Sequence, residues 1–343
     1  MRLRTLTPLL LAVFGVALFT LITSRVLLFV HIFSNHSGTS LTQEEIEAAY
    51  NTSTGGGHGE DPRQQYIPRI IHQIFHNWKD PNNETMPSDW DAERQSCIIN
   101  NPDFEYHLWS ERKSREFIAT NYDWFLPTYD GYSLPVQRID SLRYFLLRHF
   151  GGIYIDLDNG CSRSLTPLLS LSAFLTDGGH GALSNNLIAA RPNHPFWTLV
   201  TESLIPWGYK YPFPYFTISY SSGQWFVTAL WERYHRQLER LAVTPEEDKI
   251  YRIMMDMRDG ADRWVFFTQG RGGTWDNWDN HLFSYIGNVL VPRILENLLF
   301  IGMGLVAVVG LTWALRRWCR RGAGRGYRKL PPPPETDGAH EMV

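Results

Sequence analysis

The 343-residue sequence has no glycine-rich phosphate loop of the Walker or dinucleotide-binding type and no internal repeat. The missing loops argue against nucleotide hydrolysis and hydride transfer, because both chemistries commonly depend on such loops. Cysteine is scarce, with three residues, and the net charge of −3 shows no strong excess of either sign. We expect no nucleic-acid partner. Cys97 and Cys161 either pair in an oxidising compartment or stay as two buried thiols, and the sequence leaves both open.

Charged residues are also absent from two long apolar blocks, Leu6–Ser24 and Asn297–Leu315. A helix of this length reaches about 28 Å, close to the hydrocarbon thickness of a bilayer. Basic residues precede the first block and follow the second, which predicts a cytosolic location for both ends and a lumenal location for the chain between them. The alternative for the first block is a cleaved signal peptide. We expect a Golgi membrane, or another membrane of the secretory pathway.

Three glycosylation sequons, at Asn35, Asn51 and Asn83, fall in the part predicted to be lumenal. The segment between the first apolar block and residue 67 is rich in Ser, Thr and Gly, which favours a flexible stem. The predicted organisation is a cytosolic N-terminus (1–5), a transmembrane helix with its interface (6–33), a lumenal stem (34–66), a lumenal catalytic domain (67–293), a second transmembrane helix (294–318) and a cytosolic, basic, Pro-rich tail (319–343).

Apolar patterns predict strands at Ile67–Phe75, Phe104–Trp109 and Ile153–Leu157. They predict helices at Asp89–Ile99 and Val136–Phe150. Strands that alternate with helices indicate an α/β fold with a largely parallel sheet.

The motif most indicative of chemistry is Gly151–Cys161, which contains Asp156 and Asp158. Side chains alternate along a strand, so Tyr154 and both carboxylates are expected to point out of the core together. Carboxylates at the carboxyl end of a strand in an α/β sheet suit Mg²⁺ or Mn²⁺, which usually completes its shell with substrate phosphates. A sugar nucleotide supplies a diphosphate of this kind. An Asp-x-Asp triplet alone also occurs in many solvated loops.

The helix before this strand carries Asp140, Arg143 and Tyr144 on one face, at spacings of three and four residues. One interpretation is a surface ion pair of little energetic consequence. The other places Arg143 on the phosphates or sugar of a donor and Asp140 on a ribose or sugar hydroxyl.

Four ordered motifs together resemble glycosyltransferase family 32. They are Ile67–Phe75, Asn101–Trp109, Arg138–Tyr144 and Gly151–Asp158. The resemblance implies a GT-A-type nucleotide-sugar-binding fold, GDP-mannose as donor, Mn²⁺ (or Mg²⁺) as cofactor, and retention of the anomeric configuration.

Residue by residue, the resemblance assigns Asp156 and Asp158 to the metal and the donor diphosphate. It assigns Asp140, Arg143 and Tyr154 to donor binding.

The resemblance also places Phe75 beside the nucleobase and Asn186 at the transferred sugar, where relatives often have aspartate. In the Trp-rich stretch 272–281, Asp276 or His281 is a candidate additional metal ligand. The alternative for that stretch is a purely structural loop.

The second apolar block indicates a lipid acceptor, because family members that act on protein-linked glycans usually have one amino-terminal anchor. Length and apolar carboxyl-terminal segments resemble the members that mannosylate inositol phosphorylceramide in sphingolipid synthesis. We therefore expect the membrane and inositol phosphorylceramide as partners, and leave a regulatory membrane subunit open. The alternatives are a Golgi α-mannosyltransferase acting on protein-linked glycans and a catalytically inactive homologue with a regulatory role.

Overall fold

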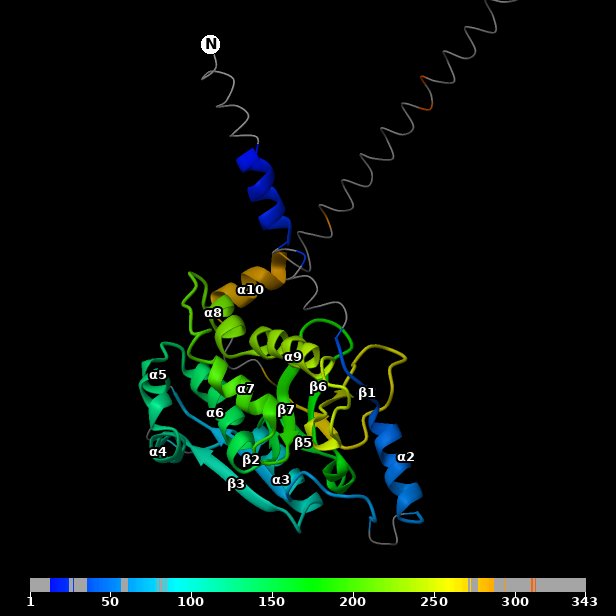
Figure 1. Ribbon diagram of the computed structural model, residues 1–343. Coiled ribbons are helices and arrows are strands. Elements are labelled where there is room, and N and C mark those ends of the chain that lie inside the picture. Colours follow the sequence, from blue (N-terminus) through cyan, green and yellow to red (C-terminus); the bar gives the residue numbers. More distant parts are fainter. Residues whose placement is uncertain are drawn as a thin grey trace, which may run out of the picture. The chain divides into compact units, whose positions relative to one another are not determined.

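The computed structural model describes residues 13–24, 27, 36–56, 61–78, 80, 83, 85–270, 272, 277–286, 293, 310 and 312. The chain divides into two units, Met1–Asn277 and Trp278–Val343 (Figure 1). Residues 13–24 are helical, but no helix within the described ranges has the length and apolarity needed to cross a bilayer. Most of the predicted spans 6–33 and 294–318, and the whole tail 319–343, lie outside the described residues.

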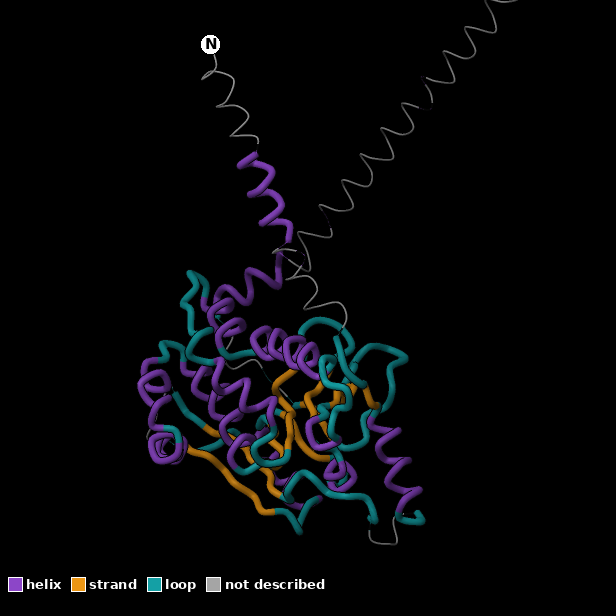
Figure 2. Tube along the Cα trace, in the orientation of Figure 1, coloured by secondary structure: helices purple, strands orange, loops and turns teal. Residues whose placement is uncertain are grey.

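Helices, strands and connecting loops follow one another as Figure 2 shows. In the first unit the helices are α2 (Gln43–Ser53), α3 (Ser88–Asn100), α4 (Glu111–Asn121), α5 (Leu126–Gly131), α6 (Pro135–His149), α7 (Pro195–Ser203), α8 (Pro214–Ser221) and α9 (Gln224–Leu238), with short 3₁₀ turns η1 (Asp123–Phe125), η2 (Thr166–Ser170) and η3 (Glu246–Asp248). The strands are β1 (Ser40–Leu41), β2 (Ile70–Phe75), β3 (Glu105–Ser110), β4 (Gly152–Ile155), β5 (Asn159–Cys161), β6 (Ala173–Asp177), β7 (Ser184–Ala190), β8 (Tyr251–Met254) and β9 (Phe267–Gln269). The second unit contains α10 (Trp278–Tyr285).

A seven-stranded sheet in the order β1-β8-β6-β7-β4-β2-β3 forms the centre of the described part of the first unit. Neighbouring strands run parallel except at β7, which is antiparallel to both β4 and β6. The predicted α/β fold with a largely parallel sheet is confirmed. The pair β5 and β9 forms a separate two-stranded sheet.

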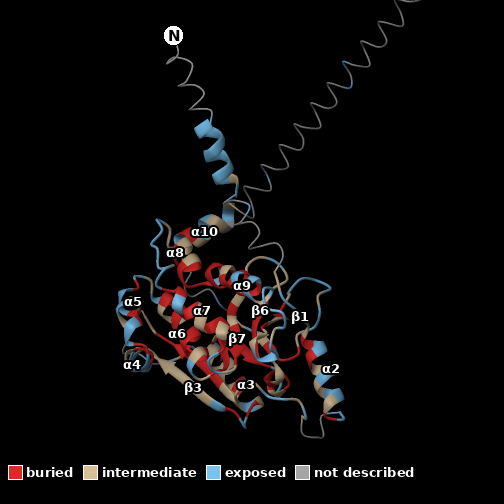
Figure 3. Ribbon diagram, in the orientation of Figure 1, coloured by how far each residue is buried: buried red, intermediate tan, exposed pale blue. Residues whose placement is uncertain are grey.

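Apolar side chains pack against both faces of the large sheet, and Figure 3 colours much of the centre of the first unit as buried. On one face, Tyr154 packs into a core built with α4 to α7 and α9. On the other, Ile153 and Ile155 pack into a core that includes residues of α2 and α3. The prediction that Tyr154 points out of the core is therefore wrong, because a sheet covered on both faces buries alternate side chains on both sides.

The predicted flexible stem at 34–66 is wrong for a large part of its length. Strand β1 pairs with β8, and α2 begins at a capping box in which Thr42 and Glu45 bond each other's backbone N–H groups. Ile46 is buried, and the Gln43 amide oxygen accepts the N–H groups of Val265 and Phe266. Buried apolar contact and a satisfied helix start anchor this segment to the domain. The sequon residues Asn51 and Asn83 are exposed, and Asn35 lies outside the described residues.

Cys97 of α3 and Cys161 of β5 form a disulfide, with their Cα atoms 4.6 Å apart. Two hydrogen bonds beside the disulfide also join α3 to β5. The Ser96 hydroxyl accepts the Cys161 N–H at 2.9 Å, and the Asn100 amide donates to the Cys161 carbonyl at 2.8 Å. The structure thus decides between the two states that the sequence left open. Strand β5 begins directly after Asp158, so the disulfide anchors one side of the turn that contains the two aspartates.

Candidate active site

The two aspartates lie where three strand ends meet. Strands β2 and β4 are parallel, so their carboxyl ends reach the same edge of the sheet. The antiparallel strand β7 begins at that edge, and the Asp156 N–H donates to the Asn186 carbonyl at 2.8 Å. Ligands of α/β proteins bind outside the carboxyl ends of the strands.

Two glycines make the turn from α6 into β4. The Gly151 N–H donates to the Leu147 carbonyl at 3.0 Å, which closes the helix. Gly151 and Gly152 have φ angles of +67° and +88°, a region that favours glycine. A Cβ atom on either residue would approach a backbone carbonyl oxygen, of Ala190 or Ile70, to 2.7 Å. The glycine pair therefore lets β4 start with only two residues between it and the end of the helix, and directs its end toward the site.

Asp156 is held from two directions. Tyr154 donates its hydroxyl to Asp156 Oδ1 at 2.5 Å, and Arg143 Nη1 donates to Oδ2 at 3.2 Å. Strand β4 ends at Ile155 rather than at Leu157 as predicted, and the N–H of Asn159 closes a turn onto the Asp156 carbonyl at 2.9 Å. The two aspartates are therefore turn residues and not alternate residues of a strand.

Arg143 is a buried cation between two carboxylates. Its Nη1 lies 3.2 Å from Asp156 and its Nη2 lies 3.4 Å from Asp140 Oδ1, while the guanidinium stacks 4.7 Å from the centre of the Tyr154 ring. Burial lowers the pKa of Arg143, but the two carboxylates outweigh it and raise the pKa above its usual value. The Arg143 and Asp140 side chains are only 5% and 6% exposed. The surface ion pair considered from the sequence is therefore excluded.

Asp140 lies behind Arg143 in a network that spans three segments. Its Oδ1 accepts the Asn185 amide at 3.0 Å and its Oδ2 accepts the Ser222 hydroxyl at 3.0 Å. Tyr144 accepts the Asn185 amide at 2.7 Å and donates to the Ser222 carbonyl at 2.7 Å. Burial raises the pKa of Asp140 to about 6, although Arg143, Ser222 and Asn185 oppose the shift.

Sequence reasoning missed Asn185 and Ser222. Asn185 adjoins the predicted Asn186, and alternation along β7 turns the two amides to opposite sides. The alternation of side chains along the strand could therefore have indicated Asn185. Ser222 follows α8 and lies 82 residues from Asp140 in the chain. No local pattern marks it.

The negative charge of Asp158 is less compensated by neighbouring cations than that of Asp156. Burial raises its pKa to about 6, and the neighbouring charge of Asp156 adds to the effect. Arg143 pairs with Asp156, whereas in the described part of the chain no cation forms an ion pair with Asp158. The second sheet frames the residue, since the Gly270 N–H donates to the Asp158 carbonyl at 2.6 Å. A Cβ on Gly272 would come within 2.3 Å of Asp158 Oδ2.

These features fit a divalent cation. Arg143 forms an ion pair with Asp156 but not with the neighbouring Asp158, and a hard cation would relieve the negative charge that remains. Within the described ranges, no cluster of three or more His, Cys, Asp or Glu residues could hold a metal ion. One or two carboxylates suffice for Mg²⁺-type sites, because substrate phosphates and water supply the other ligands.

Asn186 lies beside the turn and is held by its neighbours. Its amide oxygen accepts the hydroxyls of Thr176 at 2.8 Å and Ser184 at 2.7 Å, and its amide nitrogen donates to Asn159 at 3.2 Å. This network ties β7 to β6 and to the residue that follows Asp158.

The other predicted residues are more dispersed. Phe75 ends β2 at the same edge of the sheet, is mostly buried, and meets the Trp90 ring edge-on at 6.4 Å. Asp276 lies outside the described residues. His281 is an exposed residue of α10 in the second unit. The structure thus groups Asp140, Arg143, Tyr154, Asp156, Asp158 and Asn186 at one edge of the sheet.

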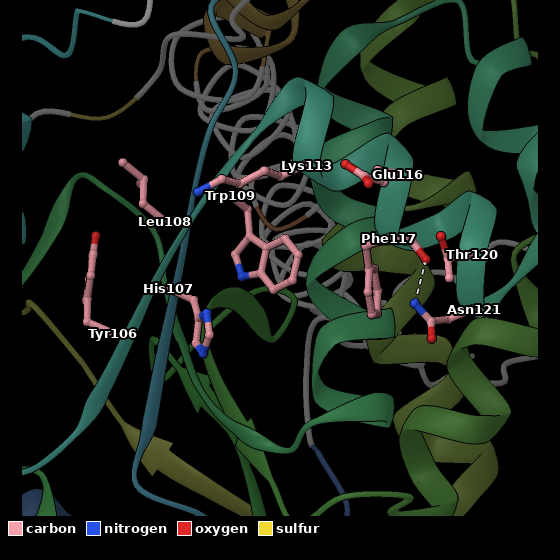
Figure 4. Close-up of a pocket in the computed structure, with 9 residues that line it drawn as sticks. All are labelled: Tyr106, His107, Leu108, Trp109, Lys113, Glu116, Phe117, Thr120 and Asn121. Atoms are coloured by element: carbon pink, nitrogen blue, oxygen red, sulfur yellow. Dashed lines mark hydrogen bonds between the residues drawn. The ribbon is translucent and has the colours of Figure 1, made fainter.

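A pocket of about 360 Å³ lies beside β3 and α4, apart from these residues. The Trp109 and Phe117 rings face its interior in Figure 4. None of the predicted site residues lines it; the lining consists of Tyr106, His107, Leu108, Trp109, Lys113, Glu116, Phe117, Thr120 and Asn121.

Comparison with known proteins connects this geometry to a family. Residues 87–175, which include α3, α6 and both aspartates, match the family model described as a glycosyltransferase sugar-binding region containing the DXD motif. The resemblance predicted from the four motifs is confirmed.

Two curated fungal proteins are similar over a longer range. Mannosyl phosphorylinositol ceramide synthase SUR1 of Saccharomyces cerevisiae is 34% identical over 239 residues, which cover 70% of this chain and 59% of the relative. Inositol phosphoceramide mannosyltransferase 2 of Schizosaccharomyces pombe is 37% identical over 230 residues, 64% of this chain and 63% of the relative. The chain thus spans about six tenths of the length of these relatives. Among solved structures, PaToxG glycosyltransferase aligns with a TM-score of 0.38 at 14% identity, over 57% of this chain and 77% of that one.

Proposed function

We propose that this protein is a metal-dependent mannosyltransferase with a GT-A-type fold that moves mannose from GDP-mannose to inositol phosphorylceramide. The observation that carries the proposal is the pair Asp156 and Asp158 at the sheet edge, with Arg143 buried behind it. The names of the fungal relatives support the sugar and the acceptor. The GDP-mannose donor, Mn²⁺, retention and the Golgi location follow from the family resemblance and the predicted topology.

The side chains of the site divide into two proposed roles. Asp158, with Asp156 beside it, would hold Mn²⁺ or Mg²⁺, which when bound would stabilise the charge that develops on the leaving diphosphate. Arg143 and Tyr154 fix the Asp156 carboxylate through one hydrogen bond to each of its oxygens. Asp140 in turn holds Arg143 from the opposite side at 3.4 Å. The site is therefore organised before the donor arrives, which is what a stabilising electrostatic environment requires.

The donor would lie over the carboxyl ends of β2 and β4, with Phe75 near the base and Asn186 near the sugar. Direct donor contacts of Asp140, Arg143 and Tyr154 remain part of the proposal. We also propose a regulatory membrane subunit and an additional metal ligand, which is either Asp276 or His281.

The product of the reaction tests this proposal. Membranes containing the full chain, and membranes prepared without it, would be incubated with Mn²⁺, labelled GDP-mannose and either inositol phosphorylceramide or a mannosylated glycopeptide. We expect labelled lipid only with the full chain, and release of the label by an α-mannosidase, as retention requires. Label on the glycopeptide alone would contradict the lipid acceptor, and no transfer to either acceptor would contradict an active mannosyltransferase.

A matched variant makes the test specific to the site. Asp158→Asn should lose transfer by a hundredfold or more, because removing a group that stabilises transition-state charge costs about 3–4 kcal/mol. Asp103→Asn alters an exposed aspartate of the same domain and should leave the rate unchanged. Equal loss in both variants would point to a general folding defect.

A further inference from the structure

The loop between α7 and α8 is apolar and lies on the surface. From Ser203 to Trp231 the sequence contains one charged residue, Lys210. The loop residues Ile205, Tyr209 and Tyr211 are 46%, 67% and 37% exposed. We call Ile205–Pro212 the aromatic loop. Exposed apolar side chains with so little charge around them are uncommon on a purely water-facing surface.

The aromatic loop is held in this conformation by its own contacts. The backbone N–H of Tyr211 donates to the Thr217 hydroxyl at 3.0 Å, and that hydroxyl donates to the Phe213 carbonyl at 3.1 Å. The Trp207 ring packs edge-on against Phe226 of α9 at 5.5 Å. The Tyr209 and Tyr211 rings meet edge-on at 5.0 Å. These contacts fix the backbone of the loop, from which the exposed side chains project.

Helix α8 connects the aromatic loop to the candidate active site. The helix begins at Pro214, separated from the loop by one residue, and has eight residues. It ends before Ser222, whose hydroxyl donates to Asp140 Oδ2 at 3.0 Å. At 1.5 Å per residue the helix is about 12 Å long. The far end of α8 thus lies about 12 Å from the loop, at a residue that contacts the Asp140 carboxylate behind Arg143.

We propose that the aromatic loop docks on the bilayer surface and presents the lipid acceptor to the site; this inference rests on the proposed function. Tyrosine favours the interface between hydrocarbon and water. Lys210 would face the anionic headgroups, and no acidic residue lies between Glu202 and Glu232 to repel them. The uncharged blocks Leu6–Ser24 and Asn297–Leu315 of the same chain are the apolar segments that would anchor the protein to a bilayer.

A probe measurement tests the docking without relying on activity. The full chain, with Cys319→Ser and Tyr209→Cys, would be labelled with an environment-sensitive fluorophore and reconstituted into vesicles containing spin-labelled lipids. The control label is at Val243→Cys, which is 81% exposed on the loop after α9. We expect the lipid spin labels to quench the label at 209 by at least about threefold more than the label at 243. Equal quenching at the two positions would overturn the proposal.

An activity comparison separates this inference from the proposed function. Tyr209→Ser combined with Tyr211→Ser should raise the KM for lipid acceptor in vesicles about tenfold and leave the KM for GDP-mannose unchanged. Transfer to soluble inositol phosphate, the headgroup without its ceramide, should match the wild type, which also shows that the variant is folded. Met257→Ser, at another exposed apolar residue, is the matched control. An unchanged lipid KM would contradict the docking, whereas absence of transfer by the wild type would contradict the proposed function itself.

Discussion

Asp140→Asn is expected to stabilise the first unit at neutral pH while it reduces transfer. Burial raises the pKa of Asp140 from 3.8 to about 6 in spite of Arg143, Ser222 and Asn185. Between those two values the folded chain binds more protons than the unfolded chain, so wild-type stability falls as the pH rises through this window and is constant above it. The pKa difference corresponds to about 3 kcal/mol of stability lost by pH 7.

Asparagine has the shape to keep every hydrogen bond at this position. Its oxygen would accept the Asn185 amide as the carboxylate does. Its nitrogen would donate to the Ser222 hydroxyl, which lies 3.4 Å from the Ile218 carbonyl and would then donate there. The variant removes the buried charge without leaving a polar atom unpaired. We therefore expect a gain of up to about 3 kcal/mol at pH 7.5 and almost none near pH 4.

Thermal unfolding of the full chain in detergent micelles, followed by near-ultraviolet circular dichroism at pH 4 and 7.5, measures this effect. For a domain of this size the gain corresponds to a rise in midpoint of about 6–12 °C at pH 7.5. Transfer should fall at least about tenfold, because Arg143 loses one of its two carboxylates. The control is Asp177→Asn, which breaks a buried pair with Arg252 at 2.6 Å and should destabilise the protein. A lower midpoint for Asp140→Asn at pH 7.5, or an equal rise at both pH values, would refute the reasoning.

Three further results follow from the geometry. Replacing Cys97 and Cys161 together by alanine should cost about 2–5 kcal/mol in non-reducing urea unfolding, and an unchanged midpoint would contradict the role of the disulfide. Gly152→Ala should cost about 2 kcal/mol or more in the same assay, because φ is +88° and the new Cβ meets a backbone carbonyl oxygen at 2.7 Å. Gly131→Ala, where nothing lies within 4 Å, is its control. Affinity for Mn²⁺ should fall as the pH drops through about 6, since the pKa of Asp158 is raised to about 6 and a neutral carboxyl binds cations poorly. Equal affinity at pH 7.5 and 5 would contradict this assignment.

Local patterns in the sequence were sufficient for three strands of the large sheet, β2, β3 and β4, and for part of the site. The strand at Ile70–Phe75, the helix at Pro135–His149 and the two glycines after it all carry their signals within a few residues. Alternation placed Tyr154 and Asp156 on one side of the chain, and their hydrogen bond confirms this. What alternation could not show was that a second layer of helices buries the tyrosine.

The features that the sequence did not reveal depend on distant contacts or on competing signals. Ser222 reaches Asp140 because α8 ends beside α6, and the Cys97–Cys161 pair depends on a distance across 64 residues. The polar composition around Thr42 favoured a flexible stem, so the ordered structure of this segment was not predicted. The spacing from Thr42 to Glu45 is nevertheless a capping-box signal. Composition favours a stem only when no such signal is present.

Binding of Mn²⁺ tests the assignment of the Asp156–Asp158 turn most directly. Mn²⁺ would be titrated into the full chain in micelles at pH 7.5, with GDP present, and the free ion measured by electron paramagnetic resonance. We predict one bound ion for the wild type, affinity at least about tenfold weaker for Asp158→Asn, and no change for the exposed-site control Asp103→Asn. Equal Mn²⁺ affinity in the wild type and Asp158→Asn would contradict the central claim that this turn holds the metal and the donor diphosphate.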